Sequence, residues 1–555
     1  RPMQRRFASV PSFQATALLL QERIPKTTVF FADTHGEITG ERASDGSLDA
    51  PIRVITSPDT PHPEVQLLSN GRYHVMVTNA GGGYSRWNGL AVTRWRQDST
   101  RDPWGTFCYL HDVESGAVWS SAYQPTLTTP DHFEAIFSEG RAELRRRDHE
   151  IESYTEIVVS PEDDLELRRL RVTNRSRTRR VIEVTSYTEV VLAPPAADDL
   201  HPAFSNLFMQ TEVLDAGSAI LCHRRPRSRD ESTPWMFHAM VVRGDPEPGS
   251  TGDAALAPSC ETDRMRFIGR DRTLAAPQAL DEAGALSGTA GSVLDPMVAI
   301  RQRILLEADQ TATLDLIYGI GETREQALGL VEKYQDARLA NRVFDLAWTH
   351  SQVVLRQLNA TPADAQLYGS LASSILYTNA SLRAEPGVLA QNRRGQSGLW
   401  SHAVSGDVPI VLCQIADQAN IALVHQLVQA HAYWRLKGLT VDLVIWNEDR
   451  AGYRQQLQEQ ILGLIAAGVE AHVVDRPGGI FIRPADQISD EDRVLFQTVA
   501  CAILSDSRGT LAEQINRRAP RLKQMPAFKP SGSPAQEPEG VGPQRPALRL
   551  SLIHI

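Results

Sequence analysis

From about residue 62 to residue 320, hydrophobic and polar residues alternate in short runs that Gly, Asn, Asp and Pro residues separate. These runs are rich in β-branched and aromatic residues, which is typical of strands with one buried face. They recur roughly every 10 to 20 residues over about 260 residues, which is too long a stretch for a single immunoglobulin-like module. The pattern predicts a large antiparallel β-sandwich over residues 62–322. The clearest expected strands are 73–78, 91–95, 107–110, 154–159, 165–173, 181–191, 239–242 and 311–320.

The hydrophobic period changes near residue 323, where apolar residues begin to recur at steps of three and four. This spacing places them on one face of a helix and predicts a pair of helices. A further helical stretch is expected from 364 to 382, before Pro386 and the glycine-containing segment 392–398 interrupt it. Residues 323–400 are therefore predicted to form a helical linker.

Apolar runs and helical segments alternate between residues 408 and 475. The expected strands are 409–415, 441–446 and 471–474, and the expected helices between them are 421–437 and 453–467. This order predicts parallel strands joined by right-handed helical crossovers. We expect a small three-stranded βαβαβ unit within residues 401–518, closed by a helical stretch from 490 to 515. Neither a phosphate-binding loop nor a GxGxxG motif after a strand occurs there, so nucleotide binding is unsupported.

The two ends of the chain follow other patterns. Residues 1–27 carry apolar residues at helical spacing, and residues 28–61 are predicted to be a linker. Because the chain starts at Arg1 inside this helical pattern, we expect further sequence before it. After Arg518 the periodicity is lost and Pro, Gly and Ser dominate, so residues 519–555 are expected to be a disordered or artefactual tail.

Composition restricts the classes of function. Hydrophobic residues make up 42% and charged residues 22%, as in soluble globular proteins. Because 67 acidic residues exceed 57 basic ones, the net charge of −10 gives no general attraction to nucleic acid or anionic lipid. No apolar run of about 18 residues occurs, so no direct membrane insertion by this fragment is expected. The five cysteines are widely spaced and form no metal-ligand motif, which favours reduced, packed thiols and a cytoplasmic compartment. We expect neither a metal nor a cofactor.

One segment is a candidate carbohydrate contact. Residues 78–87 place three consecutive glycines between two expected strands, and glycine allows close approach of the backbone to a neighbour or a ligand. The side chains beside them could stack on a sugar ring and bond its hydroxyl groups. The alternative is a hairpin loop whose aromatic residues only cover the end of the sandwich. The candidate substrate-binding residues are Gly82, Gly83, Tyr84, Arg86 and Trp87.

Other aromatic residues nearby offer the same chemistry. An aromatic face suits the apolar side of a pyranose ring at low conformational cost. Most of these residues are expected to belong to the sandwich core rather than to a site. They are Trp95, Trp104, Tyr109, Trp119 and Tyr123.

These motifs belong to longer runs that resemble a known enzyme family. Residues 65–90, followed by 94–96 and 104–110, resemble the phosphorylase-like C-terminal region of cyclic β-1,2-glucan synthases, which is related to the cellobiose phosphorylase family. Four later runs show the same resemblance, which extends over about residues 1–518. These runs are 393–400, 405–409, 430–438 and 505–511.

The resemblance implies a galactose-mutarotase-like β-supersandwich of the kind that precedes the helical barrel of cellobiose phosphorylase. It places the glycine-rich loop toward the active-site side and makes residues 1–27 the C-terminal remnant of an upstream glycoamylase-like domain. The family couples a membrane glycosyltransferase that builds β-1,2-glucan from UDP-glucose to C-terminal domains that shape chain length. The implied location is the cytoplasmic face of the inner membrane, as a soluble part of a membrane-bound parent.

Catalysis cannot be assigned to residues of this chain. The family's phosphorylase-type acid lies on the helical barrel, and no stretch here matches that motif, so the isolated fragment is expected to be inactive. The first hypothesis is a carbohydrate-processing module that binds β-1,2-glucan weakly and works with missing upstream and downstream domains of the same polypeptide. A structural spacer between catalytic domains and a self-sufficient glycoside phosphorylase are the alternatives. The missing barrel argues against the phosphorylase.

Overall fold

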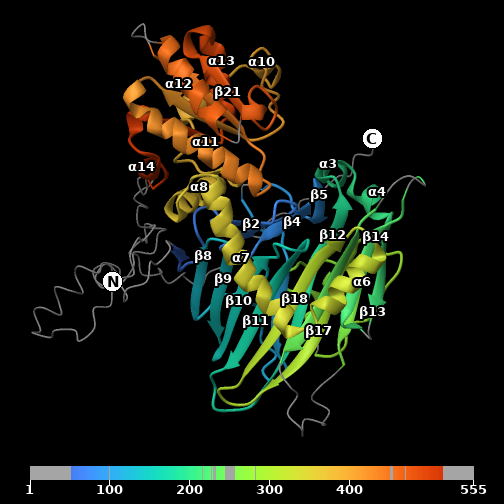
Figure 1. The fold of residues 1–555 in the computed structure, drawn as a ribbon. Helices are drawn as coiled ribbons and strands as arrows, with labels where there is room; N and C mark the ends of the chain where they lie inside the picture. Colours follow the sequence, from blue (N-terminus) through green and yellow to red (C-terminus); the bar gives the residue numbers. More distant parts are fainter. Residues whose placement is uncertain are drawn as a thin grey trace, which may run out of the picture. The chain divides into compact units, whose positions relative to one another are not determined.

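The computed structural model describes residues 52–516, apart from 99, 215–216, 227, 229–232, 244–256, 282, 450–453 and 469–470. Its elements are labelled in Figure 1. The predictions for residues 1–27, for most of the linker 28–61 and for the tail 519–555 lie outside the described residues.

In the part of the chain that the structure describes, the first sheet of the sandwich has nine strands, and every pair of neighbours runs antiparallel. The edge strand β1 lies in the segment predicted as a linker and pairs with β8, so the sheet begins before residue 62. In spatial order the strands are β1 (Arg53–Ile55), β8 (His132–Ser138), β9 (Arg141–Asp148), β10 (Ile151–Val159), β11 (Leu165–Asn174), β18 (Thr311–Gly321), β15 (Trp235–Arg243), β14 (Ala219–Arg224) and β13 (Met209–Leu214).

The second sheet also has nine strands among the described residues and is organised by β12, the longest of these. This strand pairs with one strand on one side and with two strands, β6 and β5, along the other. The strands are β16 (Ser259–Asp263), β17 (Pro296–Leu306), β12 (Arg180–Ala193), β5 (Leu90–Thr93), β4 (Gly83–Trp87), β3 (Tyr73–Thr78) and β2 (Val65–Ser69), with β6 (Phe107–Asp112) and β7 (Val118–Ser120) beside β12.

The alternating pattern of the sequence explains how the two sheets pack. In β9 every second residue is buried, and Ala142 and Leu144 enter a core shared with residues such as Val184 of the second sheet. One face of each sheet is thus removed from water, which is the main stabilising contribution. The expected antiparallel sandwich is confirmed. Four of the five cysteines are buried, as packed thiols are expected to be.

Helices α6 (Arg324–Lys333) and α7 (Ala337–Gln357) lie across the outer face of the first sheet (Figure 1). Thr323 and Asp336 cap their N-termini by accepting hydrogen bonds from backbone N–H groups. Apolar residues of both helices pack on Leu167, Ile317 and other residues of this face. The predicted pair of helices is confirmed.

A third, smaller sheet contains four parallel strands in the order β21-β20-β19-β22. The chain reaches it through helix α8 (Pro362–Leu376), which begins with a capping box of Thr361 and Asp364. Its elements are β19 (Ile410–Ile415), α11 (Ile421–Leu436), β20 (Asp442–Asn447), α12 (Arg454–Ala467), β21 (Ile480–Pro484), α13 (Asp490–Val499), β22 (Ala502–Ser505) and α14 (Leu511–Ile515). Short helices elsewhere are α3 (Pro195–Leu200), α4 (Pro202–Asn206), α5 (Arg264–Ile268), α9 (Pro386–Leu389) and α10 (Ser397–Trp400).

The prediction of parallel strands joined by helices is confirmed, but the predicted position of the third strand was wrong. Residues Ala471–Val473 form a single 3-10 turn, and the strand follows at Ile480–Pro484, where Ile480 and Phe481 are buried beside β20. The stretch 490–515, predicted to be helical, contains the fourth strand β22, which pairs with β19. A buried strand of four residues, three of them apolar, has no periodicity that distinguishes it from a helix.

An apolar cluster joins the second sheet to the helices and to the parallel sheet. Leu67 and Met76 belong to the same cluster as Tyr368 of α8 and Trp434 of α11. This contact brings Tyr377, the C-cap residue of α8, to the sandwich. Within the described residues, no helix is long and apolar enough to cross a membrane.

Candidate functional site

A cleft of about 490 Å³ lies beside the glycine-rich loop between β3 and β4. Its volume falls in the range of small-molecule sites, roughly 300–1,000 Å³. It is lined by Pro58–Pro63, Asn79, Ala80, Asp98, Thr100–Trp104, Tyr123–Pro125, Leu127, Arg264, Arg272–Ala275, Tyr377 and Thr378. The cleft therefore draws its walls from segments that are far apart in the sequence.

The consecutive glycines let one wall of the cleft approach the sheet. A Cβ atom at Gly82 would lie 2.3 Å from Oδ1 of Asp102, and one at Gly83 would lie 1.9 Å from the carbonyl oxygen of Met76. The Gly83 N–H donates to the carbonyl oxygen of Trp104 at 2.7 Å. Of the two uses of glycine that the sequence left open, close approach to a neighbouring protein segment is the one observed.

Asp102 is held in this wall by two hydroxyl groups. Thr78 Oγ1 donates to Oδ2 at 2.5 Å, and the Tyr377 hydroxyl donates to Oδ1 at 2.8 Å. Only 7% of the residue is exposed, and this burial raises the pKa of its carboxyl group to about 7, although both hydrogen bonds oppose the change. A buried carboxyl group that titrates near neutrality in a cleft is a feature of functional sites.

The remaining walls are fixed by hydrogen bonds, of which those from side chains are partly buried. The Asn79 amide donates to the carbonyl oxygens of Ser57 and Pro58 and so holds the wall 58–63. The Tyr109 hydroxyl donates to the carbonyl oxygen of Leu274 at 2.8 Å, and the Gln124 N–H donates to a carbonyl oxygen of the glycine-rich loop. Preformed walls reduce the entropy that a ligand loses on binding.

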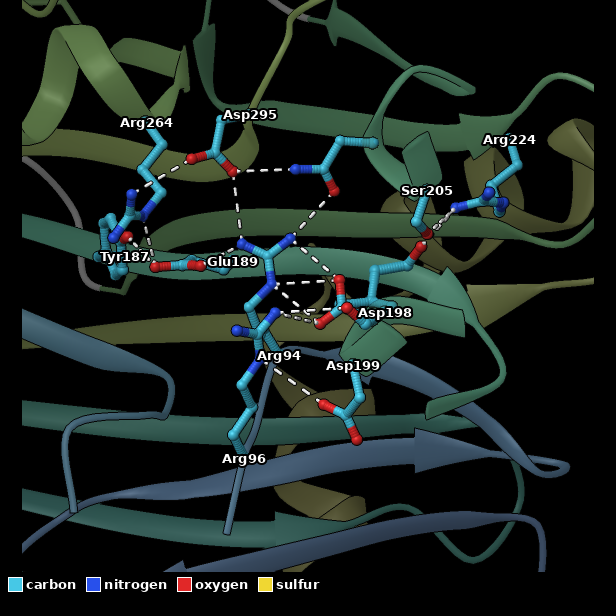
Figure 2. A network of polar contacts seen from close by, with 12 residues as sticks. Arg94, Arg96, Tyr187, Glu189, Asp198, Asp199, Ser205, Arg224, Arg264 and Asp295 are labelled. Atoms are coloured by element: carbon cyan, nitrogen blue, oxygen red, sulfur yellow. Dashed lines mark hydrogen bonds and ion pairs between the residues drawn. The ribbon is translucent and has the colours of Figure 1, made fainter. Parts of the chain in front are cut away.

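Figure 2 shows a network of ion pairs centred on Arg94. Its guanidinium donates to Glu189 Oε2 at 2.6 Å, to Asp198 and to Asp295. Burial alone would lower the pKa of Arg94, but the carboxylates of Glu189 and Asp198 raise it overall. The network ties the end of β12 to the short helices α3 and α4, because Asp198 lies on α3 and Asn206 on α4.

Two residues of the network, Arg264 and Arg96, which are labelled in Figure 2, connect it to the cleft. Arg264, which lines the cleft, donates to Glu189 Oε1 at 2.7 Å and to Asp295 Oδ2 at 3.2 Å. Arg96 pairs with Asp198 and lies over the ring of Trp104, with 5.7 Å between its guanidinium carbon and the ring centroid. The network therefore positions two cleft residues, Arg264 and Trp104.

The predicted contact residues divide into two groups. Gly82 and Gly83 lie directly behind the cleft wall. Tyr84 is only 3% exposed, with its ring 5.5 Å from that of Trp95 and beneath the Arg86 guanidinium at 4.2 Å, so no ring face is open to a ligand here.

Trp87 is half-buried, and its Nε1–H donates to Asp164 Oδ2 at 2.7 Å. Neither Trp87 nor Arg86 nor Tyr84 lines the cleft. That these three side chains touch sugar stays a prediction.

Of the wider aromatic set, Trp104 and Tyr123 line the cleft. Tyr109 and Trp119 are buried in the core and Trp95 packs against it, so three of the five belong to the core, as most were expected to. Sequence reasoning missed Asp102 and Tyr377. Asp102 sits in a turn-like Arg-Asp-Pro segment, where aspartate is common for backbone reasons, so no signal marked it.

Comparison with known proteins places this fold in a family. Residues 49–337 match the glycosyl hydrolase 94 supersandwich domain. The chain is 32% identical over 513 residues, 92% of its length, to the cyclic beta-(1,2)-glucan synthase NdvB of Rhizobium meliloti (strain 1021). It is 24% identical over 296 residues, 52% of its length, to an N,N'-diacetylchitobiose phosphorylase of Vibrio furnissii.

A solved structure of a putative kojibiose phosphorylase from human microbiome covers 60% of this chain and 42% of its own, with a TM-score of 0.33 and 10% identity. The chain spans 18% of the length of the synthase and 35% of that of the chitobiose phosphorylase. The described strands of the sandwich, from Arg53 to Gly321, fall within the matched region. The chain is a homologue of a cyclic β-1,2-glucan synthase and belongs to the glycosyl hydrolase 94 supersandwich family.

Proposed function

We propose that this chain is a carbohydrate-binding and processing module of a cyclic β-1,2-glucan synthase, acting in β-glucan synthesis and in the control of chain length. The observation that carries this proposal is the 32% identity to such a synthase across 92% of the chain. The cleft beside the glycine-rich loop supports it, because it combines aromatic and polar groups in a preformed cavity.

The module is not catalytically complete alone. Cleavage of a glycosidic bond requires a positioned proton donor together with an attacking group on the other side of the sugar. The chain spans only 18% of the length of its synthase relative, which leaves most of that protein to supply other domains. In the intact polypeptide the module works with those upstream and downstream domains, at the cytoplasmic face of the inner membrane.

The glucan-facing surface includes the loop and strand at residues 81–87. Gly82 and Gly83 shape it by admitting the wall that contains Asp102 and Trp104. Arg86 and Trp87, which are partly exposed, are the side chains on this strand that a sugar could reach, and Tyr84 supports Arg86 from beneath. Because further domains complete the surface, the isolated chain binds β-1,2-glucan in the millimolar range, or roughly 4 kcal/mol.

Titration of the chain with soluble β-1,2-glucan tests this function against a purely structural spacer. We expect saturable binding in the millimolar range, measured by line broadening of the glucan resonances on addition of protein. A matched titration with dextran, an α-linked glucan, serves as the control and should bind at least several-fold more weakly. Absence of saturable binding to β-1,2-glucan would favour the spacer.

A further inference from the structure

The cleft contains a buried acid with neutral partners. In the described structure its hydrogen bonds come from Thr78 and Tyr377, and no ion pair with a basic residue is found there. A carboxylate has about four acceptor positions, so two donors leave capacity for further hydroxyl groups. The partners already bound are themselves hydroxyl groups, the same chemistry that a sugar presents.

Three arginines line the cleft, together with acidic residues of the same lining. Arg264 is engaged by the carboxylates of Glu189 and Asp295, and Arg272 by that of Asp281. Arg101 is exposed and shares the lining with Asp59 and Asp98. Arg96, behind the Trp104 ring, pairs with Asp198 and Asp199. Among the described residues there is also no group of three or more metal-type side chains that could hold a cation. A neutral polyhydroxylated ligand fits this distribution of charge best.

Aromatic side chains supply the other half of sugar recognition. Trp104 and Tyr123 are both half-buried and line the same cleft as Asp102. The Trp104 backbone is fixed by the Gly83 N–H, and its ring is contacted by the Arg96 guanidinium. Stacking on a ring that is already held in place costs a ligand little ordering entropy.

We propose that the Asp102 cleft is a glucosyl subsite, in which Asp102 accepts hydrogen bonds from the hydroxyl groups of a neutral β-linked gluco-oligosaccharide and Trp104 stacks on its ring. This inference rests on the proposed function and names the place and the chemistry of binding. Tyr377 is a positioning residue, because it orients the carboxylate from the end of α8.

The experiment uses the whole chain labelled with 5-fluorotryptophan and observed by fluorine NMR. The chain has nine tryptophans, and Trp104→Phe identifies the Trp104 resonance by its loss. Linear β-1,2-gluco-oligosaccharides of defined length are titrated to tens of millimolar. Line broadening of the oligosaccharide resonances reports total binding. Trp348, which is 58% exposed on α7, is the internal control.

We expect a saturable shift of the Trp104 resonance and an unmoved Trp348 resonance. At pH 8, above the pKa of about 7, Asp102→Asn should raise the Kd by about five- to tenfold, because it removes the charged acceptor while keeping the shape. Asp59→Asn, which changes an exposed acid at the same cleft, should alter the Kd by less than about twofold. Melting curves check that each variant folds, and Tyr123→Ala replaces Asp102→Asn if that variant does not.

Two outcomes overturn the subsite and are distinguishable from each other. In the first, the glucan binds but the Trp104 resonance does not shift, or both Asp102→Asn and Tyr123→Ala bind the glucan as tightly as the wild type does. The cleft is then not the binding site, and the proposed function stands. If neither readout shows binding of any β-1,2-glucan, both the subsite and the proposed function fail.

Discussion

Asp102→Asn should change how the stability of the protein depends on pH. The wild-type carboxyl group has a pKa of about 7 in the folded chain and 3.8 as its ordinary value, with burial as the cause. The folded state therefore holds this proton more tightly than the unfolded state does. The contribution of this group to the stability of the fold is fully present at low pH. It decreases as pH rises above the pKa of the unfolded state and is lost once pH exceeds the pKa of the folded state.

The magnitude follows from the two pKa values. Each pKa unit corresponds to about 1.4 kcal/mol, so charging Asp102 inside the fold costs about 4 kcal/mol by pH 8. Asparagine has nearly the same shape and no charge, and its carbonyl oxygen can accept from Thr78 or Tyr377. The free energy of unfolding of the wild type, relative to that of Asp102→Asn, should therefore fall by about 1.4 kcal/mol per pH unit between pH 5 and pH 7.

The assay is urea unfolding of both proteins, followed by tryptophan fluorescence at several pH values from 5 to 8. Taking the difference between the two proteins at each pH cancels the contributions of all other titrating groups. Asp59→Asn, which removes an exposed charge from the same cleft, is the matched control and should show a small difference. A difference between wild type and Asp102→Asn that stays constant from pH 5 to pH 8 would refute the reasoning.

Three further predictions concern the core, the ion-pair network and catalysis. Tyr84→Phe should leave stability within about 0.5 kcal/mol, because the described structure gives the buried hydroxyl no partner, whereas Tyr84→Ala should cost about 3–5 kcal/mol in urea unfolding. Arg94→Met should cost about 3–5 kcal/mol, because Glu189 and Asp198 lose their buried counter-charge, and a melting temperature equal to that of wild type would contradict this. The purified chain should release no glucose 1-phosphate from β-1,2-glucan in phosphate buffer, so any sustained release above a boiled control would show that it is a phosphorylase.

The sandwich could be predicted because alternation at period two is a local signal. Strand Tyr73–Thr78 and the long β12 were located within a residue or two, since each has one face in the inter-sheet core. The strands at Ile480–Pro484 and Ala502–Ser505 were misplaced or missed, because such short buried runs carry no period. Their identity is decided by pairing with β20 and β19, which sequence alone does not show.

The cleft was harder to predict than the fold, because its parts meet only in three dimensions. Asp102 and Tyr377 are separated by 275 positions and are joined by one hydrogen bond. The glycines were recognised as a place of close approach, but whether a ligand or another protein segment approaches depends on where residues 102–104 run. Tyr84 illustrates the reverse case, because an aromatic residue beside glycines looks the same in sequence whether its ring faces solvent or the core.

The most direct test of the proposed role uses the intact synthase that contains this chain. Trp104→Ala and Trp87→Ala are made singly in that protein, with Trp348→Ala as the control at an exposed position away from the cleft. The length distribution of the cyclic glucans is then measured by mass spectrometry, at matched amounts of folded enzyme. We predict that Trp104→Ala shifts the distribution and that Trp348→Ala does not. If both Trp104→Ala and Trp87→Ala give the wild-type distribution, the module does not control chain length, and the sandwich acts as a structural spacer.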